Sequence, residues 1–311
     1  MKINLANIKK AKKLLDKSEC VAVPTETVYG LAGNAYSNNA CKKIFTLKKR
    51  PRNNPLIVHY YSVQNIKKDC HLNNSFFKLY KSFCPGPITF ILSLKKNSKI
   101  SKMVTNKKKS LAVRFPKHSI MRNLLKKIDY PLAAPSANLS SKLSAVCSND
   151  VKEDFGKKIK YILEGGRSSI GIESTIIDVR KEPKILRLGG LEISSIEKII
   201  GKKIKIQNYI GKIKVPGQSK LHYSPGIPVR LNVKKLKKNE AYLTIKKEKN
   251  SKLNYFFLSK KGNLNEAAKN LYSTLRKIKN KKFRSIAVSN IPNIGIGKSI
   301  NDRLRRASKF K

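Results

Sequence analysis

The stretch from Pro24 to His59 constrains the fold more than any other part of the chain. Residues 21–23 form a short apolar run that a proline ends, which is typical of a buried strand. The glycine-rich segment 30–34 follows, and its residue types predict a tight turn whose backbone can approach a ligand. Residues 40–47 then carry apolar side chains at helical spacing, and residues 56–60 form another apolar strand. This succession predicts a mixed α/β unit.

Cations gather on the turn before the second of these strands: Lys48, Lys49, Arg50 and Arg52. Prolines at 51 and 55 stiffen the turn, so the charges form a fixed positive site suited to a polyanion such as a nucleoside triphosphate. A run of cations is also typical of a solvated surface, and Lys49 is interpreted in that way. Arg50 and Arg52, which lie beside the prolines, are interpreted as functional.

An isolated cation, Arg114, lies in the apolar run 110–115, which predicts a strand. Burying an arginine in such a strand costs free energy unless its charge is paired. The side chain therefore either meets a buried carboxylate or faces a pocket that holds an anion, and spacing alone favours neither.

Two later segments combine small residues with short polar side chains. Residues 130–141 contain Ser136 and Asn138 between prolines, and they are interpreted either as an ordinary turn or as a surface for a flat ligand. The glycine-rich segment 165–171 exposes backbone N–H groups that can bind anions. It leads into an expected strand at 176–177.

The order of strand and helix signals predicts two domains and a linker. Residues 1–200 alternate strands with helices, residues 201–230 are irregular and lysine-rich, and residues 231–311 predict a small β-β-α-β-α domain. Asn7 is the expected N-cap of the first helix of the chain, and Asn265 that of the first helix of the small domain. The linker contains His222 and Tyr223, which are unusual in a linker. A segment that folds back over a pocket would explain them.

The charge is extreme, with 69 Lys and Arg against 18 Asp and Glu and a net charge of +51. Because the cations are spread along the whole chain, they predict anionic ligands and weak, non-specific RNA binding rather than one dedicated surface. The five cysteines form no Cys-x-x-Cys pair, so neither a zinc site nor a disulfide framework is expected. With no signal peptide and no apolar run of membrane-spanning length, a cytoplasmic protein is expected.

A series of motifs resembles the threonylcarbamoyl-AMP synthases, the YrdC-type family in its long two-domain form. In chain order they are PTETVYGL, KKRPRNNPLIVH, CPGPIT, LAVRFP, PLAAPSANLS, GIESTIID, LRLGG, PGQSKLHYSPG and GIGKSINDRLRRAS. The resemblance implies a YrdC-like twisted mixed sheet with flanking helices and a central basic cavity, plus a smaller C-terminal α/β domain. It also implies that L-threonine, bicarbonate and ATP, with Mg²⁺, give threonylcarbamoyl-AMP and pyrophosphate. A downstream transferase would then modify tRNA beside the anticodon.

The same resemblance implies roles for individual residues. Lys48 and Arg50 would be catalytic. The residues that would bind ATP are Arg50, Arg52, Asn54, Ser110, Ser136, Ser144, Arg187, His222 and Tyr223. The residues that would hold threonine are Thr27, His59, Arg114, Ala134 and Ser174. No protein ligand is assigned to a metal.

Two other functions are weighed against this one. The global charge would suit an RNA-binding module without catalysis, but the cations confined among Gly, Pro and Ser favour a small-molecule site. A related carbamoyl-adenylate former, as in hydrogenase maturation, would carry zinc-finger and acylphosphatase-like segments, which the sequence lacks.

Overall fold

The computed structural model describes residues 4–207, 222–247 and 252–309. It contains two sheets, a large mixed one and a small parallel one. The elements of the first part are α1 (Leu5–Asp16), β1 (Val21–Val23), β2 (Gly30–Asn34), α2 (Asn38–Lys48), β3 (Ile57–His59), α3 (Val63–Ile66), β4 (Cys70–His71), α4 (Asn74–Phe83), β5 (Ile88–Leu94), α5 (Lys102–Thr105), β6 (Ser110–Arg114), α6 (Ser119–Lys126), β7 (Leu132–Ala133), α7 (Ser148–Phe155), a 3-10 turn (Gly156–Lys158), β8 (Tyr161–Ile162), β9 (Thr175–Asp178), β10 (Lys184–Arg187), α8 (Ile193–Ile200) and β11 (Lys205–Ile206). The second part follows with β12 (Val229–Arg230), β13 (Glu240–Lys246), β14 (Tyr255–Ser259), α9 (Leu264–Asn280), β15 (Ser285–Val288) and α10 (Gly297–Ala307).

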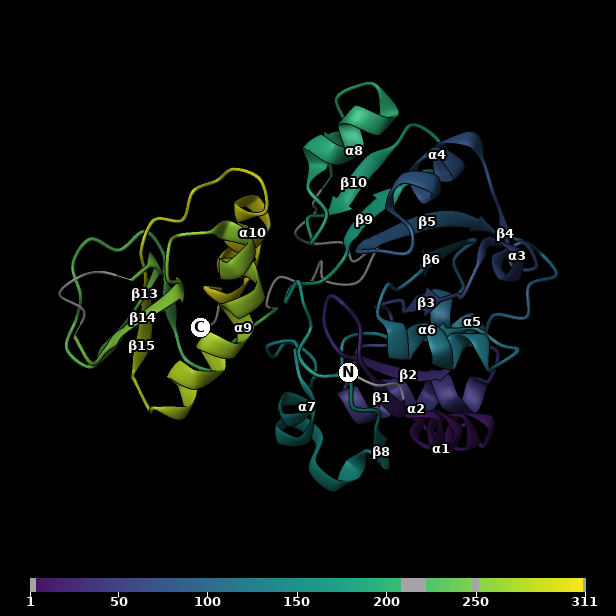
Figure 1. Ribbon diagram of the computed structural model, residues 1–311, viewed down its shortest axis with the longest axis horizontal. Helices are drawn as coiled ribbons and strands as arrows, with labels where there is room; N and C mark the ends of the chain where they lie inside the picture. Colours follow the sequence, from purple (N-terminus) through teal and green to yellow (C-terminus); the bar gives the residue numbers. More distant parts are fainter. Residues whose placement is uncertain (1–3, 208–221, 248–251, 310–311) are drawn as a thin grey trace.

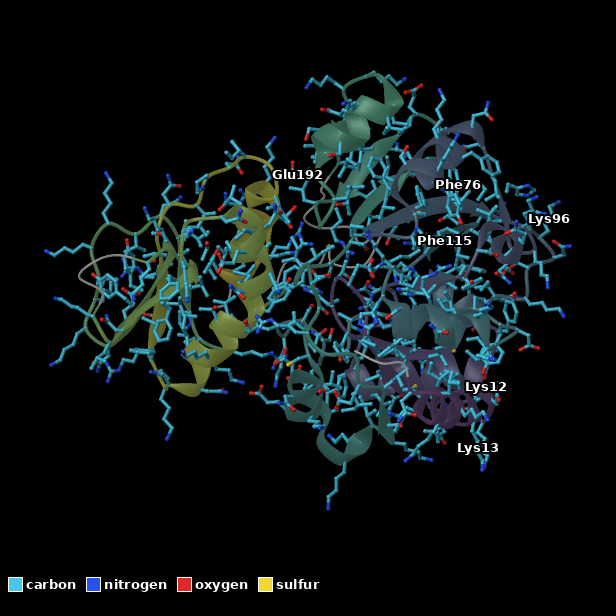
Figure 2. The ribbon with its side chains drawn as sticks, viewed as in Figure 1. Lys12, Lys13, Phe76, Lys96, Phe115 and Glu192 are labelled. Carbon is cyan, nitrogen blue, oxygen red and sulfur yellow. The ribbon has the colours of Figure 1, made fainter. Side chains whose placement is uncertain are left out.

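The large sheet has the strand order β11-β10-β9-β5-β6-β3-β7-β2-β1-β8, with β4 paired to β5. Its pairings are mixed, because β3 runs parallel to β6 while β5 runs antiparallel to it. Helices cover both faces. Buried side chains of α1 and α6 pack on one face, and those of α2, α4 and α5 pack on the other. Phe76 of α4 and Phe115, after β6, belong to this second layer, and their ring centroids are 6.3 Å apart. Both residues are labelled in Figure 2.

The small sheet has the order β12-β15-β13-β14, and all of its strands are parallel. Helices α9 and α10 lie between this sheet and the larger domain (Figure 1). One apolar cluster joins them to the first domain, because it contains Val28 and Val146 together with Leu271 and Leu304. The fold expected from the resemblance is confirmed, whereas the predicted domain boundaries at 200 and 230 stay predictions.

Three local predictions were wrong. The segment 30–34 is strand β2 rather than a tight turn, since its small residues let it pair with both β1 and β7. Asn4 rather than Asn7 caps α1, where its side chain accepts from two backbone N–H groups. Asn263 rather than Asn265 caps α9 in the same way.

The interval 201–230 was expected to be irregular throughout. Short strands occupy both of its ends, β11 on the large sheet and β12 on the small one. Residues 208–221 lie outside the described part. No helix in the described ranges is long and apolar enough to cross a membrane.

Candidate active site

A cavity opens on the face of the large sheet that α1 and α6 share. Its empty space, part of it open to solvent, is about 510 Å³. Its lining residues are Thr25, Val28, Tyr29, Gly30, Arg50, Ile57, His59, Arg114, Ala134, Pro135, Ser136, Glu173, Ser174, Arg187, His222 and Tyr223.

Strand alternation brings His59 and Arg114 into this cavity together. The two residues are register partners on the parallel strands β3 and β6, so their side chains leave the sheet on the same face. Val58, between two cavity-lining residues of β3, points to the opposite core instead. The sequence pattern and the register therefore place an imidazole beside a guanidinium.

Arg114 meets a buried carboxylate, which is one of the two alternatives that the sequence left open, while the binding of an anion in the pocket stays a prediction. Its Nη2 donates to Glu26 Oε1 at 2.7 Å, and the side chain also lines the cavity. Glu26 is held in turn by the backbone N–H of Lys117 at 3.0 Å. Burial raises the pKa of Glu26, but the charge and hydrogen bond of Arg114 outweigh burial and lower it. The Arg114 Nε, which is buried, has no hydrogen-bond partner and remains available to a ligand.

Two more buried arginines, Arg50 and Arg187, line the cavity. Arg50 Nη2 donates to the carbonyl oxygen of Pro55 at 2.8 Å, and its Nε donates to that of Asn54 at 3.0 Å. Arg187 Nη2 donates to the Ser174 carbonyl oxygen at 2.8 Å. Burial and the nearby charge of Arg187 lower the pKa of Arg50 to about 9. Guanidinium groups held in place by carbonyl oxygens form a rigid basic wall, which suits an anionic ligand.

Both histidines of the cavity are uncharged at neutral pH. Burial, together with nearby arginines, lowers the pKa of His59 and of His222 to about 3. The Nδ1 atoms of both rings and the hydroxyl of Tyr223 are buried without a hydrogen-bond partner. Buried polar atoms are normally satisfied, so this group of unpartnered atoms indicates that the cavity takes a polar ligand.

Glu173 is the one acidic residue among the lining residues. Its carboxylate accepts hydrogen bonds from Ser144, from the Tyr272 hydroxyl at 3.0 Å and from Arg303 Nε at 2.9 Å. Burial raises its pKa, but the charges of Arg303 and Arg187 and the bond from Ser144 outweigh burial and lower it to about 2. Glu173 is therefore ionised, and its partners come from both domains.

The cavity brings together most of the predicted site residues but not all of them. Those that do not line it are Thr27, Lys48, Arg52, Asn54, Ser110 and Ser144. Lys48 is buried and donates to the carbonyl oxygens of Ser136 and Asn138, which fixes the loop that lines the cavity. Asn54 accepts from Arg50 through its side chain.

The other predicted residues outside the lining have different surroundings. Arg52 is exposed, and Ser110 lines a separate small hollow beside β6. The hydroxyl of Thr27 is buried and bonded to that of Thr25, whose side chain does reach the cavity. The binding roles of all the predicted residues stay predictions.

Sequence reasoning missed the two carboxylates that organise the site. Glu26 and Glu173 are single acidic residues inside the motifs PTETVYGL and GIESTIID. In so basic a chain, an acid surrounded by apolar and small residues is itself a signal of a buried ion pair. That signal could have identified both residues, although not their partners.

Together these features define a class of protein: a two-domain α/β enzyme whose cavity gathers buried arginines and neutral histidines. Comparison with known proteins specifies the class further. The chain belongs to the family whose model is described as "Telomere recombination" (Sua5, YciO and YrdC), which matches residues 13–189. A second model, "Threonylcarbamoyl-AMP synthase, C-terminal domain", matches residues 191–309.

Several characterised relatives are similar over almost the whole chain. The threonylcarbamoyl-AMP synthase of Pyrococcus abyssi is 35% identical, with 98% of this chain and 94% of the relative covered. The Bacillus subtilis enzyme of the same name is 32% identical over 98% of this chain and 94% of its own length. The crystal structure of P. abyssi Sua5 complexed with L-threonine has a TM-score of 0.91 at 33% identity and covers 99% of this chain and 96% of that one.

Proposed function

We propose that the chain forms L-threonylcarbamoyl-AMP and pyrophosphate from L-threonine, bicarbonate and ATP. The observation that carries this proposal is the convergence of Arg50, Arg114 and Arg187 on one enclosed cavity. An amino-acid carboxylate and a nucleotide phosphate each need a fixed cation, and the cavity is lined by three buried arginines. The similarity to synthases of this name supports the assignment.

Threonine is proposed to bind at the Arg114 end of the cavity. The guanidinium of Arg114 pairs with the substrate carboxylate through its unpartnered Nε, while Glu26 keeps the side chain oriented. His59 and Ser174 offer polar contacts, and the small side chain of Ala134 leaves room for the ligand. Thr27 contributes by holding Thr25 in the wall.

ATP is proposed to bind at the Arg50 end. Arg50 and Arg187 face the phosphates, and Ser136 offers a hydroxyl for the nucleotide. His222 and Tyr223 close the cavity wall on this side, and their unpartnered polar atoms are free to bond the nucleotide. Lys48 and Asn54 act indirectly, because they hold the Ser136 loop and the Arg50 guanidinium.

This chemistry needs no protein nucleophile. The amine of threonine attacks bicarbonate, water leaves, and the resulting carbamate attacks the α-phosphorus of ATP while pyrophosphate departs. What the protein supplies is alignment of the two substrates and positive charge where the transition state becomes more negative. The buried arginines supply that charge in a site with little water, where it acts most strongly.

Mg²⁺ is expected to arrive with the nucleotide. Within the described ranges, no group of three or more His, Cys, Asp or Glu side chains could hold a metal ion. Both carboxylates near the cavity, Glu26 and Glu173, are already paired with arginine. Phosphate oxygens and water are sufficient ligands for Mg²⁺ in such sites.

Further proposals concern the surroundings of the reaction. The product is a labile mixed anhydride, so a downstream threonylcarbamoyl transferase is expected to accept it. The charge of +51 supports weak, salt-sensitive RNA association, and a cytoplasmic location stays a prediction.

The decisive test is pyrophosphate release by the full chain from ATP, measured with each substrate omitted in turn. We expect release to require both L-threonine and bicarbonate, and mass spectrometry to detect threonylcarbamoyl-AMP. Release that is unchanged without threonine would refute the proposal. Serine provides the matched control, because it lacks only the methyl group, and it should be used less well.

A further inference from the structure

In the part of the chain that the structure describes, the small sheet and helices α9 and α10 contribute no residue to the lining of the cavity, yet α9 and α10 contact Glu173 and Tyr223 of the lining directly. Both contacting side chains are buried, Tyr272 on α9 and Arg303 on α10. We propose that Tyr272 and Arg303 are positioning residues that hold Glu173 and Tyr223 in the cavity wall, so that the second domain completes the active site. This inference rests on the proposed function only for its kinetic test.

The first observation is the set of contacts to Glu173. Tyr272 donates to both carboxylate oxygens, at 3.1 and 3.0 Å, and Arg303 Nε donates to Oε2 at 2.9 Å. From the first domain, Ser144 completes the set. A carboxylate held by three side chains from two domains cannot move without breaking the domain junction.

The second observation is the packing of Tyr223. Its ring stacks on that of Tyr272, with centroids 5.8 Å apart and an interplanar angle of 23°. The guanidinium carbon of Arg303 lies 5.1 Å from the centroid of the Tyr223 ring. Only 1% of Tyr223 is exposed, so these second-domain groups form part of its enclosure.

The backbone of Tyr223 shows why such an enclosure is needed. Its φ of +62° lies in the left-handed region, which is an unfavourable conformation for a bulky residue. Conformations of this kind persist only where the surroundings hold them, and they concentrate at functional sites. His222 is adjacent, with its ring centroid 4.0 Å from that of Tyr223, so the constraint extends to a second lining residue.

The positioning groups are themselves fixed. Arg303 Nη1 donates to Asp302 at 2.9 Å, and Asp302 also accepts from Arg306. The backbone of the first domain approaches α9 closely at Gly171, where a Cβ atom would lie 2.5 Å from the Lys269 backbone. The junction is therefore closely packed, and α9 and α10 can set the position of groups in the cavity wall.

The test combines kinetics with chemical labelling of Tyr223 in the full chain. In Arg303→Lys, the ammonium keeps the charge but loses the planar group over Tyr223. We expect kcat/KM for pyrophosphate release to fall on the order of 10- to 100-fold. We also expect nitration of Tyr223 by tetranitromethane, followed by peptide mass spectrometry, to rise, because the ring becomes accessible.

The matched control is Arg276→Lys. Arg276 is a buried arginine on α9 that pairs across the same junction with Asp154 at 3.0 Å and Glu153 at 3.2 Å, without contacting Glu173 or Tyr223. It should lower the melting temperature about as much as Arg303→Lys while leaving Tyr223 protected. If both variants lose activity equally and Tyr223 stays protected in both, the second domain merely stabilises the fold and the proposal is wrong.

Tyr272→Phe keeps the proposal testable if Arg303→Lys does not fold. This variant removes only the hydroxyl bonded to Glu173 and keeps the ring stacked on Tyr223. We expect a smaller loss of kcat/KM than for Arg303→Lys, without unfolding, and wild-type kinetics would overturn the role of Tyr272. Nitration of Tyr223 does not depend on turnover. A wild-type chain without threonine-dependent activity would therefore refute the proposed function but not the positioning role of Tyr272 and Arg303.

Discussion

Among the described residues, the first domain supplies lining residues from β3, β6, β10 and the adjacent loops, and the segment before β12 adds His222 and Tyr223, whereas the small sheet with α9 and α10 supplies none. Their buried arginines show the same contrast. Arg50, Arg114 and Arg187 line the cavity, while Arg303 and Arg276 lie outside it and pair with carboxylates across the domain junction. The buried arginines that line the cavity and those that pair across the domain junction thus come from different domains.

This difference explains how an enclosed basic site can be stable. Buried cations beside one another repel and lose hydration, which costs several kcal/mol for each unpaired ion. Here Glu26 compensates Arg114 at one end, and Glu173 compensates Arg303 at the other. Glu26 and Glu173 therefore lie between the residues that line the cavity and the residues that hold that lining in place.

The largest effect is expected for Arg114→Ala, which removes one of the buried arginines that line the cavity. The threonine concentration needed for half-maximal pyrophosphate release should rise roughly 10- to 100-fold, because a charge-assisted contact to the substrate carboxylate is lost. The ATP requirement should change much less. Titration of each substrate at saturation of the other measures both, and equal effects would contradict the carboxylate role of Arg114.

An intermediate effect is expected when the pH is lowered, because acid protonates Glu173 at the domain junction. The pKa of Glu173 in the folded chain, about 2, is below the ordinary value of 4.5, so its ionised form stabilises the fold at higher pH. That stability decreases as the pH falls from 4.5 towards 2, with a loss on the order of 2 kcal/mol by about pH 3. Urea unfolding at several pH values measures this loss.

Glu173→Gln should be less stable at neutral pH and should lack this component of the acid dependence. The matched control is Glu182→Gln, whose exposed side chain pairs with exposed Lys202. It should unfold with the same pH dependence as the wild type. Identical acid sensitivity of Glu173→Gln and the wild type would show that Glu173 does not support the junction through its charge.

The smallest effect is expected for Arg52→Ala, which tests whether position rather than charge decides function. Arg52 is exposed outside the lining, while Arg50, two residues earlier, is buried in it. The ATP requirement should change less than about threefold for Arg52→Ala, as for other exposed cations, and far more for Arg50→Ala. A larger effect for Arg52 would mean that the phosphates extend beyond the cavity.

Local pattern predicted much of the fold. The apolar run at 21–23 is β1, the helical spacing at 40–47 lies within α2, and the run at 110–115 contains β6. Prediction failed where small residues permitted more than one backbone conformation, as in β2. It also failed at the helix starts, where neighbouring asparagines compete as N-caps.

The candidate site was predicted only in part, because the pattern within a motif identifies single residues but not their distant partners. Residues that face the cavity within one motif could be identified from chemistry, as with Arg50 and Arg114. Their partners could not, because Glu26 lies 88 positions from Arg114 and Glu173 lies 130 positions from Arg303. No periodicity connects residues that far apart, and only strand register and domain docking bring them together.

The sequence by itself determined the alternation of strands and helices, the chemistry of the cavity and the family, because these depend on neighbouring residues. The tertiary structure decided which cations face the cavity and which support the fold. It did so through the register of β3 with β6 and through the docking of α9 and α10, since a buried charge is stable only where a distant partner meets it.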